Sequence, residues 1–224
     1  MFNWLFNKPG YRRFDDSYAL TRNSLHKGLQ SAIEQRSEPN QLIFLVAHFP
    51  NVFSELQDAL DMWEFPYEII QHAVNRRWID QMASNHSGST PPLFLTLAEL
   101  LQFENAATEP QHQNPHIAIM IAERHPLIQR DRQIEKFSRQ ISWPVELGYF
   151  LALDDEIIKH TVSPDVIELL KQMGLQDHEL VTSHMITRRL NQATKRMARQ
   201  VQSEQPADSA KQWFQLNFPQ QAKS

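Results

Sequence analysis

The chain contains no cysteine and very little glycine. Of its 224 residues none is Cys and only five are Gly. Without Cys the chain can form no disulfide, no Cys-bound zinc site, no iron–sulfur cluster and no thiol nucleophile. With so few Gly residues, neither the phosphate-binding loop GxxxxGK[ST] nor the dinucleotide-binding motif GxGxxG occurs. These absences exclude a nucleotide site that is built on a glycine-rich loop.

An excess of positive charge and a long apolar run are also missing. The chain has 22 Lys and Arg against 26 Asp and Glu, a net charge of −4, so we do not expect nucleic acid as a partner. Apolar runs such as Leu42 to Ala47 fall far short of the ~20 residues of a membrane span. The first residues lack the pattern of a signal peptide. These features predict an unprocessed cytoplasmic protein.

The hydrophobic pattern predicts strands that alternate with helices. Five apolar segments are expected to form strands: 41–49, 66–70, 93–98, 116–122 and 148–153. Helical spacing of apolar residues is found in seven segments: 15–36, 51–63, 71–82, 127–140, 154–160, 164–173 and 183–202. This order predicts an α/β fold with a mostly parallel sheet of about five strands and a long C-terminal helix. The tail from Ser203 is polar and Gln-rich apart from Trp213, Phe214, Leu216 and Phe218, and no structure is assigned to it.

Clusters that could carry metal or acid–base chemistry are few. The ten His residues include no HExxH pair, and His112 and His116 flank a proline in a loop. The run Asp154-Asp155-Glu156 fits the first turn of a helix, where acidic side chains favour the helix dipole. We therefore expect no metal site and no catalytic residue.

The first thirteen residues combine apolar and basic side chains. Phe2, Trp4, Leu5 and Phe6 precede three basic residues, with no acid among them. Such a segment can seat peripherally at an anionic membrane surface, here the inner membrane. The alternative is a segment that packs on the body or frays.

Several short motifs occur in an order and spacing that resemble a known family. They are Glu123-Arg124-His125, Arg130-Asp131 with Gln133, Tyr149 to Asp155, and Met173-Gly174-Leu175. Together they resemble SecA, the motor ATPase of bacterial preprotein translocation, in its second RecA-like nucleotide-binding domain and the start of its scaffold helix. The resemblance implies a RecA-like three-layer domain over residues 15–160 and a helical extension over 161–202. Residues 1–14 would be an amphipathic segment and 203–224 a polar tail.

The departures from that family concern the residues that hold ATP. Phe137 and Gln140 stand where SecA has two arginines that contact phosphates, and a bidentate cation of this kind is worth ~10³-fold or more in rate. The segment LAELLQFENA, residues 97–106, replaces a glycine-rich element. The family's first nucleotide-binding domain has no counterpart here. The resemblance thus implies a retained fold without ATPase chemistry and without a nucleotide cofactor.

The favoured hypothesis is a degenerate SecA-like domain that binds protein as an accessory or regulator of translocation. In the family the last helix carries other domains, so we expect the partner-binding residues on it: Ile186, Arg188, Arg189, Leu190 and Met197. The alternative is that the chain's own Trp213, Phe214 and Phe218 cover the apolar residues of this helix.

Two other functions stay open at this point. The chain could be half of a split ATPase that a partner completes, with Arg130, Arg132 or Arg139 reaching the phosphates. It could also be an RNA-binding relic, since superfamily-two helicases share this domain, although the acidic balance argues against RNA.

Overall fold

The computed structural model describes residues 10–37, 41–85, 92–102, 116–172 and 179–218. The proposed membrane-contact residues Phe2, Trp4, Leu5 and Phe6 lie outside these ranges. No helix within these ranges is long and apolar enough to cross a membrane.

A mostly parallel sheet forms the centre of the fold. Its strands are β1 Tyr11–Arg13, β2 Ser17–Ala19, β3 Gln41–Ala47, β4 Tyr67–Ile69, β5 Leu93–Leu97, β6 His116–Ile121, β7 Val145–Ala152 and β8 Val181–Thr182. Their order is β4-β5-β3-β6-β7-β2-β8, and β1 pairs with β7 beside β2. Only β8 pairs antiparallel, with β2. The predicted α/β class with a mostly parallel sheet is therefore confirmed, and all five predicted strands are present.

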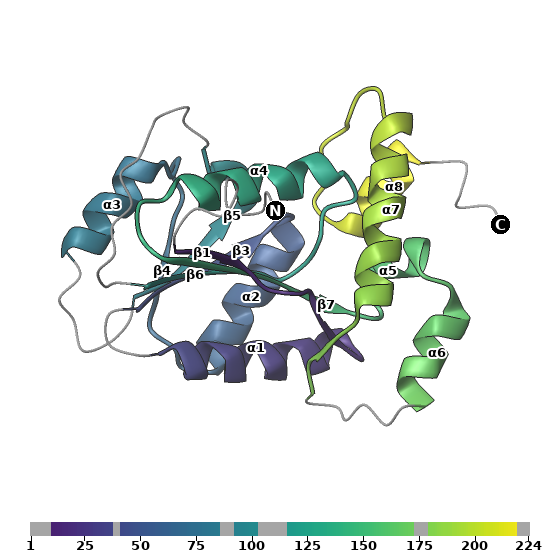
Figure 1. The fold of residues 1–224 in the computed structure, drawn as a ribbon, viewed down its shortest axis with the longest axis horizontal. Helices are drawn as coiled ribbons and strands as arrows, with labels where there is room; N and C mark the ends of the chain where they lie inside the picture. The colour runs from purple at the N-terminus through teal and green to yellow at the C-terminus, as the bar shows by residue number, and fades with distance from the viewer. Residues whose placement is uncertain (1–9, 38–40, 86–91, 103–115, 173–178, 219–224) are drawn as a thin grey trace, which may run out of the picture.

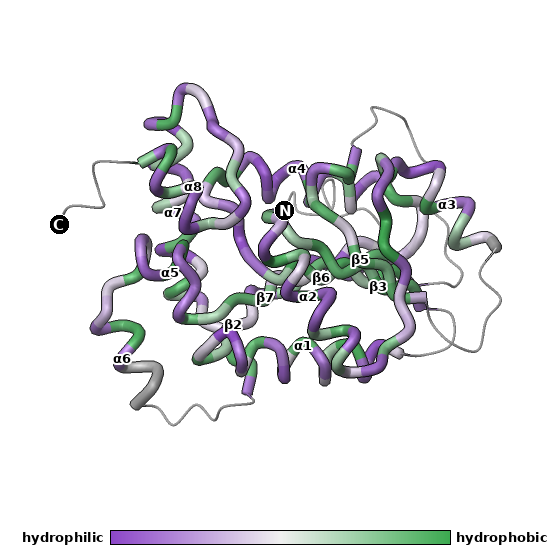
Figure 2. The backbone as a smooth tube through the Cα atoms, turned by 180° about the vertical axis from the view of Figure 1, so that it is seen from behind, coloured by the Kyte–Doolittle hydropathy of each residue, from purple (hydrophilic) through white to green (hydrophobic). Residues whose placement is uncertain are grey.

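Helices cover both faces of the sheet, which makes three layers. They are α1 Arg22–Arg36, α2 Pro50–Met62, α3 Arg76–Asn85, α4 Ile128–Gln140, α5 Glu156–Thr161, α6 Pro164–Gln172, α7 His184–Gln200 and α8 Ala210–Asn217. Figure 1 shows α1 and α2 on one face, α3 and α4 on the other, and α5 to α8 at one end. The layers meet in two apolar clusters, because alternate residues of each strand point to opposite faces. Figure 2 shows the hydrophobic central strands between helices of mixed polarity.

The observed elements differ from the sequence analysis at one helix boundary and in the tail. The predicted helix over residues 15–36 begins only at Arg22, because residues 17–19 form β2, which pairs with the last part of β7. The tail from Ser203, to which no structure was assigned, contains α8, with Ser209 as the N-cap that accepts a hydrogen bond from Gln212 N. The predicted boundaries at residues 14, 160 and 202 stay predictions, although β1 joins the sheet and α7 and α8 join the larger core cluster.

The apolar face of α7 is buried within the described chain. Ile186 and Leu190 are 0% exposed and Met197 is 6% exposed, and all three belong to the larger core cluster, which also contains Trp213 and Phe214. The prediction that these three residues bind a partner is therefore wrong for the described chain, because they are buried and α7 packs against α4 and α5. Of the predicted partner-binding residues, Arg188 and Arg189 remain exposed.

We predict that Trp213→Ala lowers the free energy of unfolding by about 3 to 5 kcal/mol, because removal of a side chain that is 1% exposed would leave a cavity in the larger core cluster. Leu216→Ala, on the same helix but 38% exposed, serves as the control and should change stability by less than about 1 kcal/mol. Urea unfolding followed by circular dichroism measures both. Equal effects of the two substitutions would show that α8 is not docked.

Candidate functional site

A cavity of about 430 Å³ lies at the carboxyl ends of β3, β5 and β6. This edge is where parallel α/β sheets usually bind ligands. His48 and Phe49 line the cavity after β3, Leu97 ends β5, and His125 follows β6. The remaining wall comes from α4 and from the C-terminal segment that contains Glu204 and Trp213. The site thus combines the sheet edge with a segment from the end of the chain.

Glu123 joins the ends of two neighbouring strands. Its Oε1 atom accepts hydrogen bonds from the backbone N–H groups of His48, at 2.9 Å, and Phe49, at 3.1 Å. Glu123 is buried, and this burial raises its pKa to about 7, although the nearby His48 and Arg22 oppose the shift. The carboxyl group therefore orders the backbone at the entrance to α2 and does not face a ligand.

Arg124 is the centre of a buried charge network. Its guanidinium lies 3.2 Å from Asp16 Oδ2 and 2.8 Å from Asp131 Oδ2, and it donates a hydrogen bond of 2.6 Å to Asn191 Oδ1. It also stacks over the ring of Tyr149, 4.5 Å from the centroid. Although burial disfavours its charge, the two carboxylates raise the pKa of Arg124 above its ordinary value. Arg124 is therefore fully charged, and Asp16 and Asp131 already neutralise this charge within the fold.

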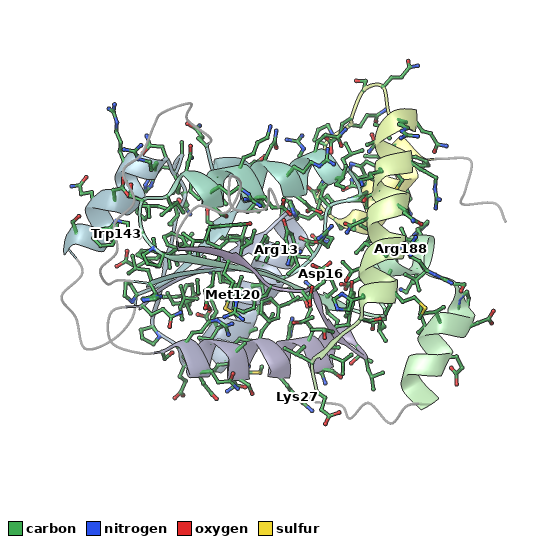
Figure 3. The ribbon with its side chains drawn as sticks, viewed as in Figure 1. Arg13, Asp16, Lys27, Met120, Trp143 and Arg188 are labelled. Atoms are coloured by element: carbon green, nitrogen blue, oxygen red, sulfur yellow. The ribbon has the colours of Figure 1, made fainter. Side chains whose placement is uncertain are left out.

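The gap between β1 and β2 directs Asp16 toward this network. The Phe14 N–H donates to Leu147 O at 2.8 Å, after which the chain separates from β7. It pairs with β7 again only at β2. Asp16, which is 0% exposed, also pairs with Arg13, and Figure 3 shows the two close together. The break in the strand therefore supplies one of the two carboxylates that Arg124 requires.

Asp131 connects α4 with the ends of β3 and β6. Its Oδ1 atom accepts a hydrogen bond from His125 N at 3.1 Å and lies 2.9 Å from His48 Nε2. Burial opposes its charge, but Arg124 and His48 lower the pKa of Asp131 below its ordinary value. The ionised carboxylate thus fixes His48 and His125 at the cavity wall.

His125 carries no charge at the cavity wall. Burial lowers its pKa well below the ordinary value, and the neighbouring His48 adds to the shift. Its Nδ1 accepts a hydrogen bond from Leu127 N at 3.0 Å, so the neutral ring carries its proton on Nε2, which lies 3.4 Å from Glu204 Oε1. Phe49 stacks on the same ring. His125 is thus a neutral, packed side chain.

Glu204 closes the cavity from the C-terminal segment. Its Oε2 accepts hydrogen bonds from Arg130 Nε and Nη2, at 3.1 and 2.6 Å, and its Oε1 accepts one of 2.9 Å from Trp213 Nε1. Glu204 and Trp213 were not among the residues that the sequence singled out for this site. Their partners are far away in the chain and no local motif marks them.

The cavity is poorly suited to a triphosphate. Among the described residues that line it, Glu99, Glu204 and Asp208 are acidic, and Arg130 is the one Lys or Arg. Arg130 is already paired with Glu204. Phosphate recognition requires cations or free backbone N–H groups that point at the ligand. The lining therefore repels an anionic ligand.

The positions that carry arginines in the resembled family point away from the cavity. Phe137 is 0% exposed in the core, and Gln140 donates a hydrogen bond to Gln102 O at 3.1 Å. Arg139 stacks over the ring of Tyr11, 4.3 Å from the centroid, on the β1 side of the sheet. None of the three lines the cavity.

The acidic run at residues 154–156 has a structural role. Asp155 is the N-cap residue of α5, and its Oδ2 accepts a hydrogen bond from Ala152 N at 2.8 Å. Burial raises the pKa of Asp155 to about 6, against the effect of Arg22 at 3.4 Å. Within the described ranges no group of His, Asp and Glu side chains is arranged to hold a metal ion. His112 lies outside those ranges, and His116 is exposed.

We predict that Arg124→Gln lowers the free energy of unfolding by about 3 to 5 kcal/mol, because it leaves Asp16 and Asp131 buried without their counter-charge. Arg132→Gln, an exposed position on α4, is the matched control and should change stability by about 0.5 kcal/mol or less. Chemical denaturation measures the difference. A loss no larger than that of the control would contradict a central role for Arg124.

A pH dependence follows from Glu123. Its pKa is higher in the folded chain, about 7, than its ordinary 4.5, so the folded state holds a proton that the unfolded state has released between these pH values. Lowering the pH from 8 to 5 should therefore raise the stability of the wild type relative to Glu123→Gln by about 2 to 3 kcal/mol. Gln keeps an oxygen acceptor for both N–H groups. Glu68→Gln, at an exposed site, should show no such change, and parallel profiles for wild type and Glu123→Gln would refute the shift.

No family model matches the chain. It is distantly similar to the protein translocase subunit SecA of Chlorobium phaeovibrioides, with 21% identity over 198 residues, which is 87% of this chain and 19% of the relative. The SecA subunit of Chlorobium phaeobacteroides is 22% identical over 195 residues, with the same two coverages. The chain therefore spans about a fifth of the length of these relatives.

A solved structure gives a further, looser likeness. The C-terminal part of the Fun30 ATPase domain superposes with a TM-score of 0.39 and 14% identity, over 76% of this chain and 53% of that one. The distant similarity to SecA thus covers most of the chain and agrees with the family resemblance of its motifs, including Glu123-Arg124-His125.

Proposed function

We propose that this chain is a degenerate SecA-like domain that does not hydrolyse ATP and acts by binding protein, as an accessory or regulator of protein translocation. Within SecA it corresponds to the second RecA-like nucleotide-binding domain and the start of the scaffold helix. The similarity to translocase subunits over 87% of the chain supports the link to translocation. A role beside that machinery places the chain in the cytoplasm or at the inner face of the membrane.

The proposed loss of ATPase activity rests on one observation. The C-terminal segment lies at the sheet edge where a nucleotide would bind. Glu204 takes both hydrogen bonds of Arg130, and Trp213 packs edge-on against His125, with ring centroids 5.8 Å apart. A phosphate group would have to displace a carboxylate and would then meet two further acids, Glu99 and Asp208. Such a cavity disfavours a nucleotide by its charge.

The arginines that a split ATPase would need are placed elsewhere. Arg139 stacks on Tyr11, and Arg132 lines a different cleft, between α4 and α7, together with Lys195. Neither shares the cavity with Arg130. Completion by a partner in trans, with Arg130, Arg132 or Arg139 reaching the phosphates, is therefore less favoured, because Glu204 holds Arg130 and the other two lie outside the cavity. This alternative is kept as an outcome of the test.

Nucleotide binding is tested with a fluorescent ATP analogue and Mg²⁺, alone and with the translocation motor of the same organism. We expect neither saturable binding nor phosphate release from the chain, and none from Glu204→Gln, which frees Arg130 but restores no other cation. The motor alone is the positive control. Saturable binding by the chain alone would contradict the proposal, and extra turnover only in the mixture would establish the split ATPase.

The link to translocation is tested by adding the chain to preprotein transport into inverted membrane vesicles. We expect a changed transport rate, and loss of the effect in the exposed double variant Arg188→Glu/Arg189→Glu. The matched control, Lys27→Glu/Arg77→Glu, reverses the same number of charges on other exposed helical positions. A transport rate that the chain leaves unchanged would argue against an accessory role.

A further inference from the structure

The outward side of α7 is strongly basic. The helix contains no Asp or Glu, and its exposed cations are Arg188, Arg189, Lys195, Arg196 and Arg199. The whole chain has a net charge of −4, so this positive charge is local. It lies on a helix whose opposite side is buried in the larger core cluster and packs against α4 and α5. Figure 3 shows Arg188 on this helix at the end of the molecule.

Three of these cations form a straight line, which we call the basic row: Arg188, Lys195 and Arg199. At 100° per residue, offsets of seven and eleven residues bring their side chains within about 40° of each other. The row runs about 16 Å along the helix axis, at 1.5 Å per residue. Arg189 and Arg196 flank it on one side. On the other side Arg132 of α4 and Lys195 line one cleft, which also contains the acidic Asp15 and Glu135.

The fold gains little from the basic row. Among the described residues no carboxylate pairs with Arg188, Lys195, Arg196 or Arg199, whereas Arg13, Arg22, Arg36 and Arg130 each have an acidic partner. Like charges four residues apart, such as Lys195 and Arg199, destabilise a helix. Arg188 and Lys195 lie between the first and last turns of α7, and only Arg199 stands in the last turn, where the helix dipole favours a cation. Apart from this contribution of Arg199, the row gains no electrostatic stabilisation from the described part of the fold.

We propose that the basic row docks an acidic helical segment of a partner protein, which rests on the proposed function that the chain acts by binding protein. A partner helix with Glu or Asp at the same spacing would meet each cation once along its length. A lipid surface is less favoured, because Met185 is the one large apolar side chain of α7 that is exposed. Nucleic acid is less favoured, because α7 has no Phe, Tyr or Trp on which bases could stack and the chain is acidic overall.

The test uses a synthetic helical peptide with Glu at positions 1, 5, 8 and 12, which follow the i, i+4, i+7 and i+11 spacing of a helix face. A peptide of the same composition in scrambled order is the control. We expect the patterned peptide to bind the full chain at least about tenfold more tightly than the scrambled one, and salt to weaken the complex steeply. Fluorescence anisotropy measures both affinities.

Matched charge-reversal variants test whether peptide binding depends on the basic row or on exposed positive charge anywhere on the chain. Arg188→Glu/Lys195→Glu/Arg199→Glu should abolish binding, whereas Lys27→Glu/Arg77→Glu/Lys211→Glu, at exposed sites on three other helices, should retain most of it. Neutralising Arg188 and Lys195 with Gln should not lower the midpoint of urea unfolding, because neither residue has a carboxylate partner in the described part of the chain, while it weakens peptide binding. A lower midpoint would show that the row has partners within the fold and would overturn the proposal.

Three further results would overturn this choice of partner. They are equal affinity for the two peptides, unchanged binding by the reversed row, and tighter, row-dependent binding of phosphatidylglycerol vesicles or of duplex RNA. Each of these results would overturn the choice of partner but not the proposed function, provided that the chain does not bind ATP and still affects preprotein transport. ATP binding by the chain, or a transport rate that the chain leaves unchanged, would instead contradict the proposed function.

Discussion

The buried ion cluster around Arg124 is the constraint on which the arrangement of this fold depends. A single guanidinium neutralises Asp16 and Asp131, which come from the break before β2 and from α4, and it holds Asn191 of α7. Four separate parts of the chain therefore meet at one positive charge that is almost fully buried. Taking three ions out of water is costly unless each is paired, so the geometry of these four parts is tightly specified. The positions of α4 and α7, and with them the shape of the sheet edge, follow from this requirement.

The same cluster determines what the edge can bind. Asp131 holds His48 and His125 at the cavity wall, and burial keeps His125 neutral. The strongest cation near the edge, Arg124, is turned inward and paired twice. What remains in the cavity is one arginine that Glu204 already holds. A site that stabilises phosphate needs a cation that has no other partner when the ligand arrives. Here Arg124 and Arg130 are already paired with carboxylates of the fold.

Much of the fold could be predicted from the sequence, and the site largely could not. Strands such as β3 and β6 are buried on both faces, so their continuous apolar runs identified them. The short strands β1 and β2 were missed, because three residues give no period and pairing with β7 alone makes them strands. The aromatic residues of the tail were noticed in the sequence, but α8 was not, because a Gln-rich segment of this length shows no clear helical period. The pair Asp16 and Arg124 is separated by 108 residues, and no local pattern reports such a contact.

The docking of α8 and the wall of the cavity depend on the same side chain. Trp213 is buried in the larger core cluster, and its indole also contacts His125 and donates to Glu204 at the cavity wall. Any ligand that displaced Trp213 from the sheet edge would expose this large apolar side chain to water. Burial of a large apolar side chain is worth about 1.5 to 3 kcal/mol, so such a displacement carries a penalty that binding would have to exceed. The outward side of α7 carries no such penalty, because its cations are already exposed. A ligand on this helix surface would therefore disturb the rest of the structure less than a ligand that displaced Trp213 from the sheet edge.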